Sequence, residues 1–326
     1  MKAGLLTIVF IAFATTGFAQ SYPPAAEQPG STAVFKDSPQ ITAWATGIEV
    51  QRGLINISNP DAMAAGSSYA TAGLPENAIG YANGSVVSLG DGGHAIATFL
   101  RPIVNGPGFD FAVFENGSTA FLELAFVEVS SDGVNYFRFP NHSETQNQTQ
   151  LGSFATPQAQ YLNNLAGKYA AQYGTPFDLS DLPDNVLLDK DNITHVKIID
   201  VVGSIDPLYA SYDSFGNAVN ESFPTPFASG GFDLQAVAVI NQQALGLQQF
   251  GKANVCLYPN PAKGQVYLKT QADTDVLIYD VSGRLVLSAK GVYNGQAVDI
   301  SALPSGTYKV EFSSNTGSSA LSLVVN

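Results

Sequence analysis

The order of apolar and polar residues predicts a chain built mainly of short β-strands. Between Phe121 and Ser130 the two kinds of residue alternate, with Leu122, Leu124 and Phe126 on one face. A repeat of two residues is typical of a strand whose two faces meet different surroundings. Phe109 to Phe114 is instead a short run rich in aromatic residues, which predicts a fully buried strand.

Strand-like patterns of this kind recur through most of the first 241 residues. Further strands are expected at Ile41 to Val50, Ser85 to Leu89, His94 to Leu100, Tyr136 to Phe139, His195 to Val202 and Phe232 to Ile240. Gly90-Asp91-Gly92-Gly93 has the composition of a hairpin turn. Between Tyr161 and Tyr173 the apolar residues fall at helical spacing, which predicts one helix. Strands with long loops and a single helix favour a jelly-roll-like β-sandwich for residues 21–241.

The ends of the chain have different patterns. Residues 1–20 resemble a secretory signal peptide, with Lys2 before an apolar stretch and small residues before the expected cleavage site. No later stretch is long and apolar enough to predict a membrane span. Residues 242–253 are a polar linker rich in Gln and Gly, and residues 254–326 alternate short strands with turns. That pattern predicts a second, small β-sandwich of the immunoglobulin-like kind.

Composition narrows the classes of partner. The chain has 326 residues, a net charge of −13 and one cysteine, Cys256, so an internal disulfide is excluded. Residues 21–251 hold 7 Lys and Arg against 22 Asp and Glu. This acidic balance argues against nucleic acid or an anionic membrane as the partner, and is compatible with Ca²⁺, neutral sugars or a solvated surface.

Three segments of residues 254–326 carry a resemblance to a known family. Tyr258 to Pro261, Ile278 to Val286 and Ile300 to Tyr308 resemble, in order and spacing, the C-terminal sorting domain of proteins exported by the type IX secretion system of Bacteroidetes. The resemblance implies recognition by the secretion machinery and a secreted or outer-membrane surface location. Leu321 to Asn326 lacks the terminal lysine that is frequent in the family.

The first domain also resembles a family of bacterial cell-surface proteins of poorly defined function. The similar segments are Gly106 to Gly117, Val127 to Gly133, Asn164 to Tyr169, Tyr173 to Leu179 and Ser229 to Val237. Members of this family are sometimes associated with outer-membrane uptake systems, including corrinoid uptake. The resemblance implies a binding role linked to transport.

Acids and an amide at expected strand ends are candidate ligands for a cation. They are Asp91, Asp110, Glu115, Asn116 and Asp233. Ca²⁺ takes several oxygen ligands, and the glycine-rich turns beside these residues expose backbone carbonyls. The alternative is that Asp110 and Asp233 accept hydrogen bonds from turn amides and that Asn116 is an ordinary turn residue.

Aromatic residues suggest a second kind of site. Trp44, Tyr209 and Tyr212 are candidates for a face that stacks on a sugar or another planar ligand. The alternative is that they pack to hold a long loop in place. For Phe223 and Phe227, which lie among prolines, packing is the preferred interpretation.

A complete catalytic set is not recognisable. Glu115, Glu123 and Glu128 include the carboxyls that a glycosidase would need, but Glu123 and Glu128 are expected on opposite faces of one strand. The leading hypothesis is therefore non-catalytic binding of an extracellular glycan or of a nutrient such as a corrinoid, with Ca²⁺ as a stabilising ion. A glycan-acting hydrolase and a structural or adhesive surface component are the alternatives.

Overall fold

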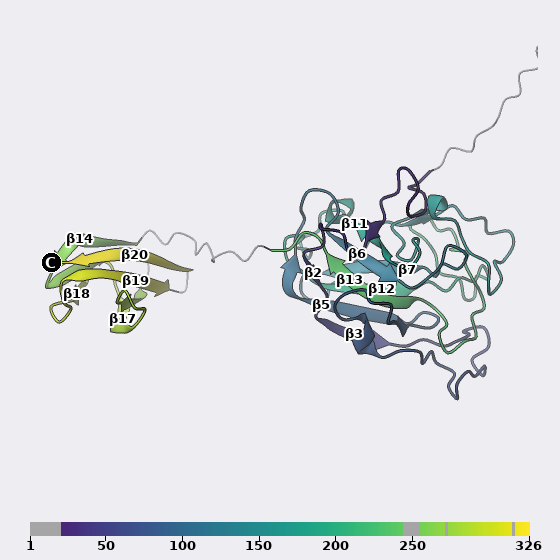
Figure 1. Ribbon diagram of the computed structural model, residues 1–326, viewed down its shortest axis with the longest axis horizontal. Coiled ribbons are helices and arrows are strands. Elements are labelled where there is room, and N and C mark those ends of the chain that lie inside the picture. Colours follow the sequence, from purple (N-terminus) through teal and green to yellow (C-terminus); the bar gives the residue numbers. More distant parts are fainter. Residues whose placement is uncertain (1–20, 244–254, 271–272, 315–316) are drawn as a thin grey trace, which may run out of the picture. The chain divides into compact units, whose positions relative to one another are not determined.

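The computed structural model describes residues 21–243, 255–270, 273–314 and 317–326. The expected signal peptide and most of the expected linker lie outside these ranges. The chain divides into two compact units, Met1–Gln243 and Ala244–Asn326 (Figure 1). Within the described residues the helical elements are short 3-10 turns: η1 (Pro75–Ala78), η2 (Ala159–Tyr161) and η3 (Leu179–Asp181).

The first unit contains two main antiparallel sheets. One has the order β1-β11-β6-β13-β2, with β4 also paired to β13, and the other has the order β3-β5-β12-β7-β8. The strands of the first sheet are β1 (Val34–Phe35), β2 (Ala43–Trp44), β4 (Val87–Ser88), β6 (Phe111–Glu115), β11 (Tyr173–Phe177) and β13 (Asp233–Val239). Those of the second are β3 (Gly47–Gln51), β5 (His94–Ile103), β7 (Ala125–Ser130), β8 (Phe137–Arg138) and β12 (Ile193–Asp200). A separate pair joins β9 (His142–Ser143) to β10 (Leu162–Asn163).

The main core combines apolar side chains from both sheets. It includes Val113 and Val237 from the six-stranded sheet and Val127, Val196 and Ile198 from the five-stranded sheet. Burying such side chains is the main favourable contribution to folding, at about 1.5–3 kcal/mol each. Because no disulfide is available, this core carries most of the stability of the first unit.

Strand β6 is buried on both faces, as the aromatic-rich run predicts. All five residues of Phe111–Glu115 are buried. Phe111 stacks on Phe177 within the main core, while Phe114 on the other face contacts Trp44. A strand with both faces covered shows no alternation of polar residues, so its sequence is continuously apolar until Glu115.

Two expected strand connections are wrong. Gly90-Asp91-Gly92-Gly93 does not close a hairpin, because β4 pairs with β13 in one sheet and β5 belongs to the other. Ile41 to Val50 is likewise not one strand: β2 and β3 lie in different sheets, and the chain crosses between them at Ala45 and Thr46. Local turn chemistry cannot distinguish a hairpin from a crossing between two sheets.

The helix expected between Tyr161 and Tyr173 is also wrong. Its apolar residues are buried as predicted, but the backbone is irregular after β10. Asn164 and Gly167 have φ values of 48° and 82°. Ala166 pairs with Ala125 at the start of β7. Left-handed residues interrupt a helix, and the backbone groups find their partners in the neighbouring strand instead.

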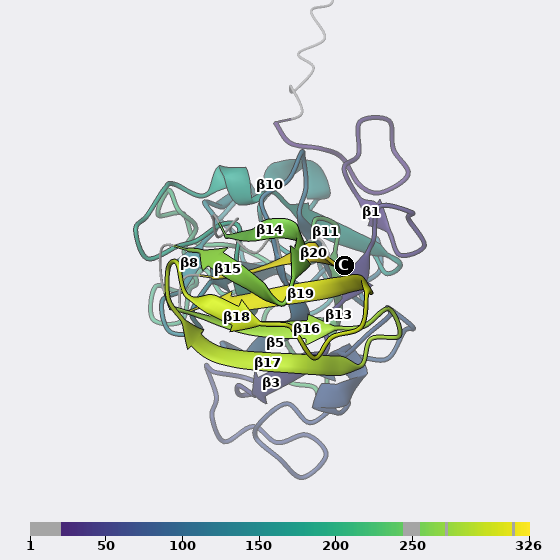
Figure 2. The same cartoon turned by 90° about the vertical axis from the view of Figure 1, so that its left-hand side faces the viewer.

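The second unit is a seven-stranded assembly with its own core. Its order is β17-β16-β19-β20-β14-β15-β18, and Figure 2 shows β17, β16 and β19 side by side. The strands are β14 (Cys256–Lys263), β15 (Gln265–Lys269), β16 (Thr274–Tyr279), β17 (Leu285–Val292), β18 (Ala297–Asp299), β19 (Gly306–Ser314) and β20 (Gly317–Val325). Val276, Ile278, Val310, Phe312 and Leu323 are buried at its centre.

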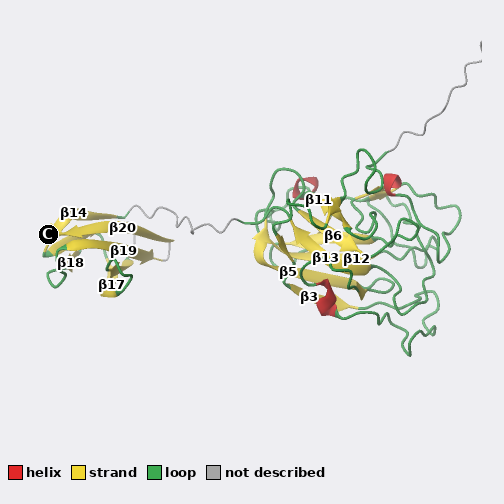
Figure 3. Ribbon diagram, in the orientation of Figure 1, coloured by secondary structure: helices red, strands yellow, loops and turns green. Residues whose placement is uncertain are grey.

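The expectation of a mainly β-sandwich fold is confirmed. Strands and loops make up nearly all of the described chain (Figure 3). Among the described residues, no helix has the length and apolar character needed to cross a membrane.

Candidate functional site

Six carboxyl groups lie together at one end of the first unit. We call them the acidic cluster: Asp91, Glu115, Glu123, Asp200, Glu221 and Asp233. Glu115 ends β6 and pairs with Leu234, which follows Asp233 at the start of β13. Asp200 ends β12 in the other sheet. The ends of both sheets therefore supply acids to one region of the sandwich.

Burial dominates the electrostatics of this cluster. It raises the pKa of Glu115, Glu123, Asp200 and Glu221 well above the ordinary values, because an ionised carboxyl loses its hydration there. Repulsion adds to the effect: Glu115 is repelled by Asp233, and Glu123 by Glu115. The carboxyls are thus near enough to oppose each other's ionisation.

Asp91 and Asp200 are each held by backbone amides. Asp91 Oδ2 accepts a hydrogen bond of 2.7 Å from the Ile57 amide. Asp200 accepts from the Gly92 amide at 2.9 Å and from the Phe232 amide at 2.7 Å. Burial nevertheless raises the pKa of Asp91 to about 6. Asp200 thus connects the end of β12 to the β4–β5 crossing and to the residue before β13, while Asp91 connects the crossing to the loop at Ile57.

Glu221 and Asp233 also have donors. Glu221 Oε2 accepts from the Leu124 amide at 2.7 Å, and Asp233 Oδ1 accepts from the Ser88 hydroxyl. Burial raises the pKa of Asp233 to about 6, although the Ser88 hydrogen bond and the Arg52 charge oppose the rise. Glu221 comes from the long loop after β12, so its hydrogen bond ties that loop to the residues before β7.

Glu115 and Glu123 differ from the other four acids. They are only 1% and 5% exposed. Glu115 Oε2 has no hydrogen-bond partner, although the amides of Asn116 and Gly117 also act on the Glu115 carboxyl and oppose the rise of its pKa. No side-chain hydrogen bond connects the Glu123 carboxyl to any residue in the described ranges, and repulsion from four neighbouring acids acts on it. Buried polar groups are nearly always paired, so these two carboxyls need an explanation.

Glycines leave space around the acids. A Cβ atom at Gly117 would lie 2.4 Å from Glu115 Oε2, and one at Gly231 would lie 2.7 Å from Asp200 Oδ1. Gly231 also has a φ of 73°, which side-chain-bearing residues rarely adopt. Glycine is therefore required at both positions by the close approach of a carboxyl oxygen.

The structure divides the five predicted cation ligands. Asp91, Glu115 and Asp233 lie in the acidic cluster, and Asn116 follows Glu115 as an exposed residue. Asp110 lies at the opposite end of β6, where the amides of Ile240 and Asn241 bond to its carbonyl. Three of the five predicted ligands therefore belong to the acidic cluster, and Asp110 lies at the other end of β6.

Asp110 has a structural role in a turn. Its carboxylate accepts hydrogen bonds from the amides of Gly106 at 2.8 Å and Leu179 at 2.7 Å. Asn241 Nδ2 donates a third, at 2.9 Å. The side chain is 0% exposed. With three donors it matches the alternative interpretation of a carboxylate that satisfies turn amides.

Three acids of the cluster, Glu123, Asp200 and Glu221, are not among the ligands that the sequence predicts. Asp200 lies at the end of an expected strand, and Glu221 lies in a long loop that was noted for its aromatic residues. Glu123 was considered only as a catalytic acid. Glu123 lies between Leu122 and Leu124, and all three residues are buried. An acid between two apolar residues is the one sequence signal that could indicate a buried carboxyl at this position.

The predicted aromatic residues lie on different elements: Trp44 on β2, and Tyr209 and Tyr212 on the loop after β12. Trp44 is half-buried against Tyr81 and Phe114, with ring centroids 5.5 Å away in both cases. No ring contact joins Trp44 to Tyr209 or Tyr212 within the described residues. Trp44 thus covers the outer face of the six-stranded sheet, while the two tyrosines lie on the loop after β12.

An exposed aromatic pair lies elsewhere on the loops. Phe154 and Phe227 are 76% and 39% exposed, and their ring centroids are 5.7 Å apart. Phe223, by contrast, is 7% exposed and packs as expected. Phe227 is more exposed than the packing interpretation leads one to expect, although its ring does contact Phe154. The Phe223 amide bonds to the Leu151 carbonyl, and the Glu221 amide bonds to the Gly203 carbonyl. The loop that carries Glu221 and Phe227 therefore lies beside the loop that carries Phe154.

A small hollow lies beside the same loops. It has a volume of about 150 Å³. Leu122, Thr156 and Lys168 are among the residues that line it. Lys168 is buried, and its ammonium group donates to the Leu162 carbonyl at 2.7 Å. Burial lowers the pKa of Lys168 to about 8.

The geometry does not assemble a glycosidase pair at the surface. Glu128 forms an ion pair of 2.8 Å with Arg138 on the five-stranded sheet. Glu123 and Glu115 are neighbours, but both are buried. Among the described residues, no three His, Cys, Asp or Glu side chains meet around one point that could hold a metal ion.

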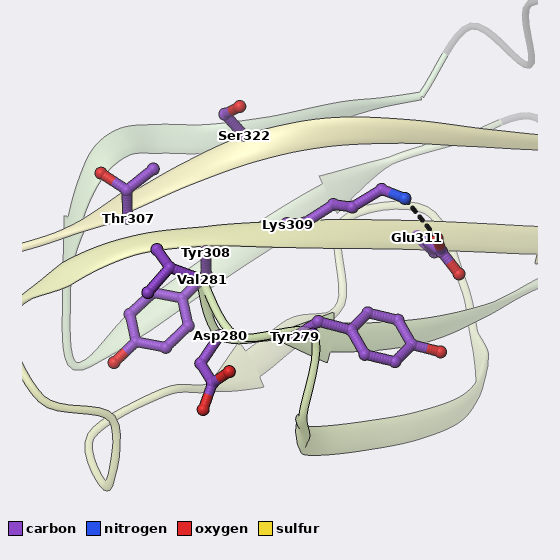
Figure 4. Close-up of a pocket in the computed structure, with 9 residues that line it drawn as sticks. Tyr279, Asp280, Val281, Thr307, Tyr308, Lys309, Glu311 and Ser322 are labelled. Atoms are coloured by element: carbon purple, nitrogen blue, oxygen red, sulfur yellow. Dashed lines mark ion pairs between the residues drawn. The ribbon is translucent and has the colours of Figure 1, made fainter.

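The second unit has a shallow hollow of its own. It has a volume of about 570 Å³ and lies over β16, β19 and β20 (Figure 4). Its lining includes Tyr279, Tyr308 and the ion pair of 2.7 Å between Lys309 and Glu311. The Tyr308 hydroxyl donates to the Pro304 carbonyl at 2.7 Å, which fixes this ring beneath the strands.

A family comparison identifies this second unit. Residues 256–326 match the family described as the secretion system C-terminal sorting domain. The expected type IX secretion sorting domain is thereby confirmed for this part of the chain. It indicates export, a secreted or cell-surface location, and interaction with the type IX secretion machinery.

Similarities to solved structures are weak. PorZ, described as a surface component of the type-IX secretion system of Porphyromonas gingivalis, is 23% identical over 28% of this chain and 14% of its own, with a TM-score of 0.20. A β-glucuronidase of Faecalibacterium prausnitzii is 12% identical over 87% of this chain and 45% of its own, with a TM-score of 0.21. The BSP domain of a biofilm associated protein is 13% identical over 72% and 48%, with a TM-score of 0.19.

These matches do not bear on the site. The chain spans less than half the length of each of these three proteins. The TM-scores are too low to support an argument about fold or activity. No curated protein sequence matches the chain.

Proposed function

We propose that residues 21–241 bind an extracellular ligand, a glycan or a nutrient such as a corrinoid, without catalysing a reaction on it. The sorting domain directs the chain to the cell exterior, where such ligands are met. The acidic surface composition favours a neutral or cationic ligand over an anionic polymer. The known partner of the second unit, the secretion machinery, serves export rather than ligand binding.

The exposed pair of Phe154 and Phe227 is the observation that carries this proposal. Two phenyl rings in mutual contact and open to solvent offer an apolar face of the kind that sugars and planar ligands stack on. The hollow beside Leu122 and Thr156 is lined in part by the segment that follows Phe154 and adds a recess for a smaller group. Loops positioned by a rigid sandwich are the usual place for such binding residues.

Binding assays with aromatic variants test this proposal. A glycan array and a titration with cobalamin identify the class of ligand. Phe154→Ala and Phe227→Ala should each weaken binding at least about 5-fold, since one stacking contact contributes about 1 kcal/mol. Leu100→Ala is the matched control, because Leu100 is 83% exposed on β5, away from these loops.

The result also separates binding from a structural role. If neither the glycans nor cobalamin bind, an adhesive or scaffolding component becomes the better interpretation. If binding is unchanged in both phenylalanine variants, the ligand contacts another face, and Tyr209→Ala and Tyr212→Ala become the variants to test.

A further inference from the structure

We propose that the acidic cluster binds a divalent metal ion, Ca²⁺ in the exported protein, through the carboxylates of Glu115 and Glu123. Both side chains are more than nine-tenths buried, at 1% and 5% exposure. Glu115 Oε2 has no partner. Glu115 ends β6 and Glu123 lies in the segment before β7, and the two carboxyls are near enough for each to oppose the ionisation of the other.

No ion pair among the described residues neutralises Glu115 or Glu123, although the Arg52 charge acts on Asp233. The ion pairs of the described residues are Arg138–Glu128, Lys190–Asp184, Arg284–Asp280 and Lys309–Glu311, all outside the cluster. Arg52 is the nearby cation, and its guanidinium group donates its hydrogen bonds to the carbonyls of Ala72, Gly73 and Ser88. Buried charges are normally paired or coordinate a metal, so a bound cation accounts for the arrangement.

The other four acids cannot all turn toward the ion. Asp91, Asp200, Glu221 and Asp233 already accept hydrogen bonds from amides or a hydroxyl. Glu115 keeps one unpaired oxygen, Oε2, although the amides of Asn116 and Gly117 also interact with its carboxyl group, and no hydrogen bond holds the Glu123 carboxyl among the described residues. The ion then completes its shell with carbonyl and water oxygens, as Ca²⁺ commonly does.

The backbone carbonyl of Phe121 lies beside Glu115 and accepts one hydrogen bond, from the Ser118 amide at 2.8 Å, which leaves its second lone pair for a ligand. A Cβ atom at Gly117 would lie 2.4 Å from Glu115 Oε2 and 2.6 Å from the Phe121 carbonyl oxygen. The two oxygens therefore border the same small space, which any larger residue at 117 would fill. All donors in the region are oxygens, which favours Ca²⁺ or Mg²⁺ over Zn²⁺. The irregular loop donors favour Ca²⁺ over the strictly octahedral Mg²⁺.

The ion would join segments that are distant in the sequence. Glu115 belongs to the six-stranded sheet, Glu123 leads into the five-stranded sheet, and Glu221 holds the long loop between β12 and β13 next to them. In a chain whose single cysteine excludes an internal disulfide, such a cross-link stabilises the loop-rich end of the sandwich. The proposal is independent of the aromatic ligand site above.

Calcium binding by the mature protein, residues 21–326, tests the proposal. After treatment with EDTA and dialysis, titration with CaCl₂ alone should give one ion per chain by calorimetry and by elemental analysis. The Tm, followed by the fluorescence of Trp44, should rise by about 5–10 °C at a Ca²⁺ concentration one hundred times the dissociation constant.

Two isosteric variants and one control locate the site. Glu115→Gln and Glu123→Gln should each weaken Ca²⁺ binding at least about 10-fold, because each removes a charged ligand. Glu128→Gln is the matched control: Glu128 lies on the neighbouring β7 and is ion-paired with Arg138, so its loss should leave Ca²⁺ affinity unchanged.

Two results would overturn the proposal. One is that EDTA-treated wild-type protein takes up no Ca²⁺ and has the same Tm in CaCl₂, MgCl₂ and EDTA, in which case protons neutralise the cluster. The other is that both Gln variants bind Ca²⁺ as tightly as wild type. If a variant does not fold, the metal content and Tm of the wild type still decide between an ion and protons.

Discussion

Replacing Asp110 by alanine should destabilise the first unit strongly and independently of any metal. The substitution removes the acceptor for the Gly106 and Leu179 amides and for the Asn241 side chain. Leaving a buried donor without a partner costs about 1–3 kcal/mol. Two orphaned amides and one weakened side-chain contact therefore amount to a loss of about 4 kcal/mol in the free energy of unfolding.

The position of Trp44 makes this loss measurable in the full mature chain. It is the only tryptophan, and it packs on Phe114 in the first unit. Urea unfolding followed by its fluorescence therefore reports on this unit and not on the sorting domain. In a unit of this size, about 4 kcal/mol corresponds to a fall in Tm of about 8–16 °C.

Companion variants sharpen the test. Asp110→Asn keeps one acceptor oxygen and should lose about half as much stability as Asp110→Ala. Asp184→Ala removes an exposed acid paired with Lys190 and should have no measurable effect. A loss below about 1 kcal/mol for Asp110→Ala, or a loss that depends on added Ca²⁺, would show that Asp110 does not act through these hydrogen bonds.

Two further predictions concern pH. In EDTA, Asp91 and Asp233 of the folded protein keep their protons up to a pKa of about 6, whereas in the unfolded chain they lose them near 3.8. The folded state therefore loses stability as these groups ionise, and the Tm should fall as the pH rises from 4.5 to 6.5. A Tm that rises over this range would contradict the effect of burial. Burial lowers the pKa of Lys168 to about 8 from 10.5, so the folded state binds fewer protons than the unfolded state between these values and stability should increase with pH there. Lys168→Met should reduce this increase in thermal scans from pH 7.5 to 9.5, and an unchanged slope would show that Lys168 is not the group responsible.

Patterns in the sequence predicted burial better than they predicted backbone conformation. Leu162, Leu165 and Tyr169 are buried as their apolar character indicates, yet they belong to a strand and irregular segments. Their spacing fits a helix, but the positive φ of Asn164 and Gly167 breaks it. A spacing of three and four residues shows which side chains are inside without showing the path between them.

The candidate site was predicted in part for the same reason. Asp91, Glu115 and Asp233 were recognised as acids at strand ends, and the register between β6 and β13 brings the last two together. Asp110 flanks the same strand in the sequence. The five residues of β6 nevertheless separate it from the acids at the other end of the strand. Glu221 had no local signal, since only the path of a long loop carries it to the cluster.

By itself the sequence determined that the chain is mainly β, that Phe111 to Phe114 lie in a buried strand, and that residues 256–326 are a sorting domain, because alternation, apolar runs and short motifs are local properties. Only the tertiary structure decided which acids meet. Carboxyls from positions 91 to 233 come together through the pairing of strands from two sheets, and that pairing depends on contacts between residues far apart in the chain.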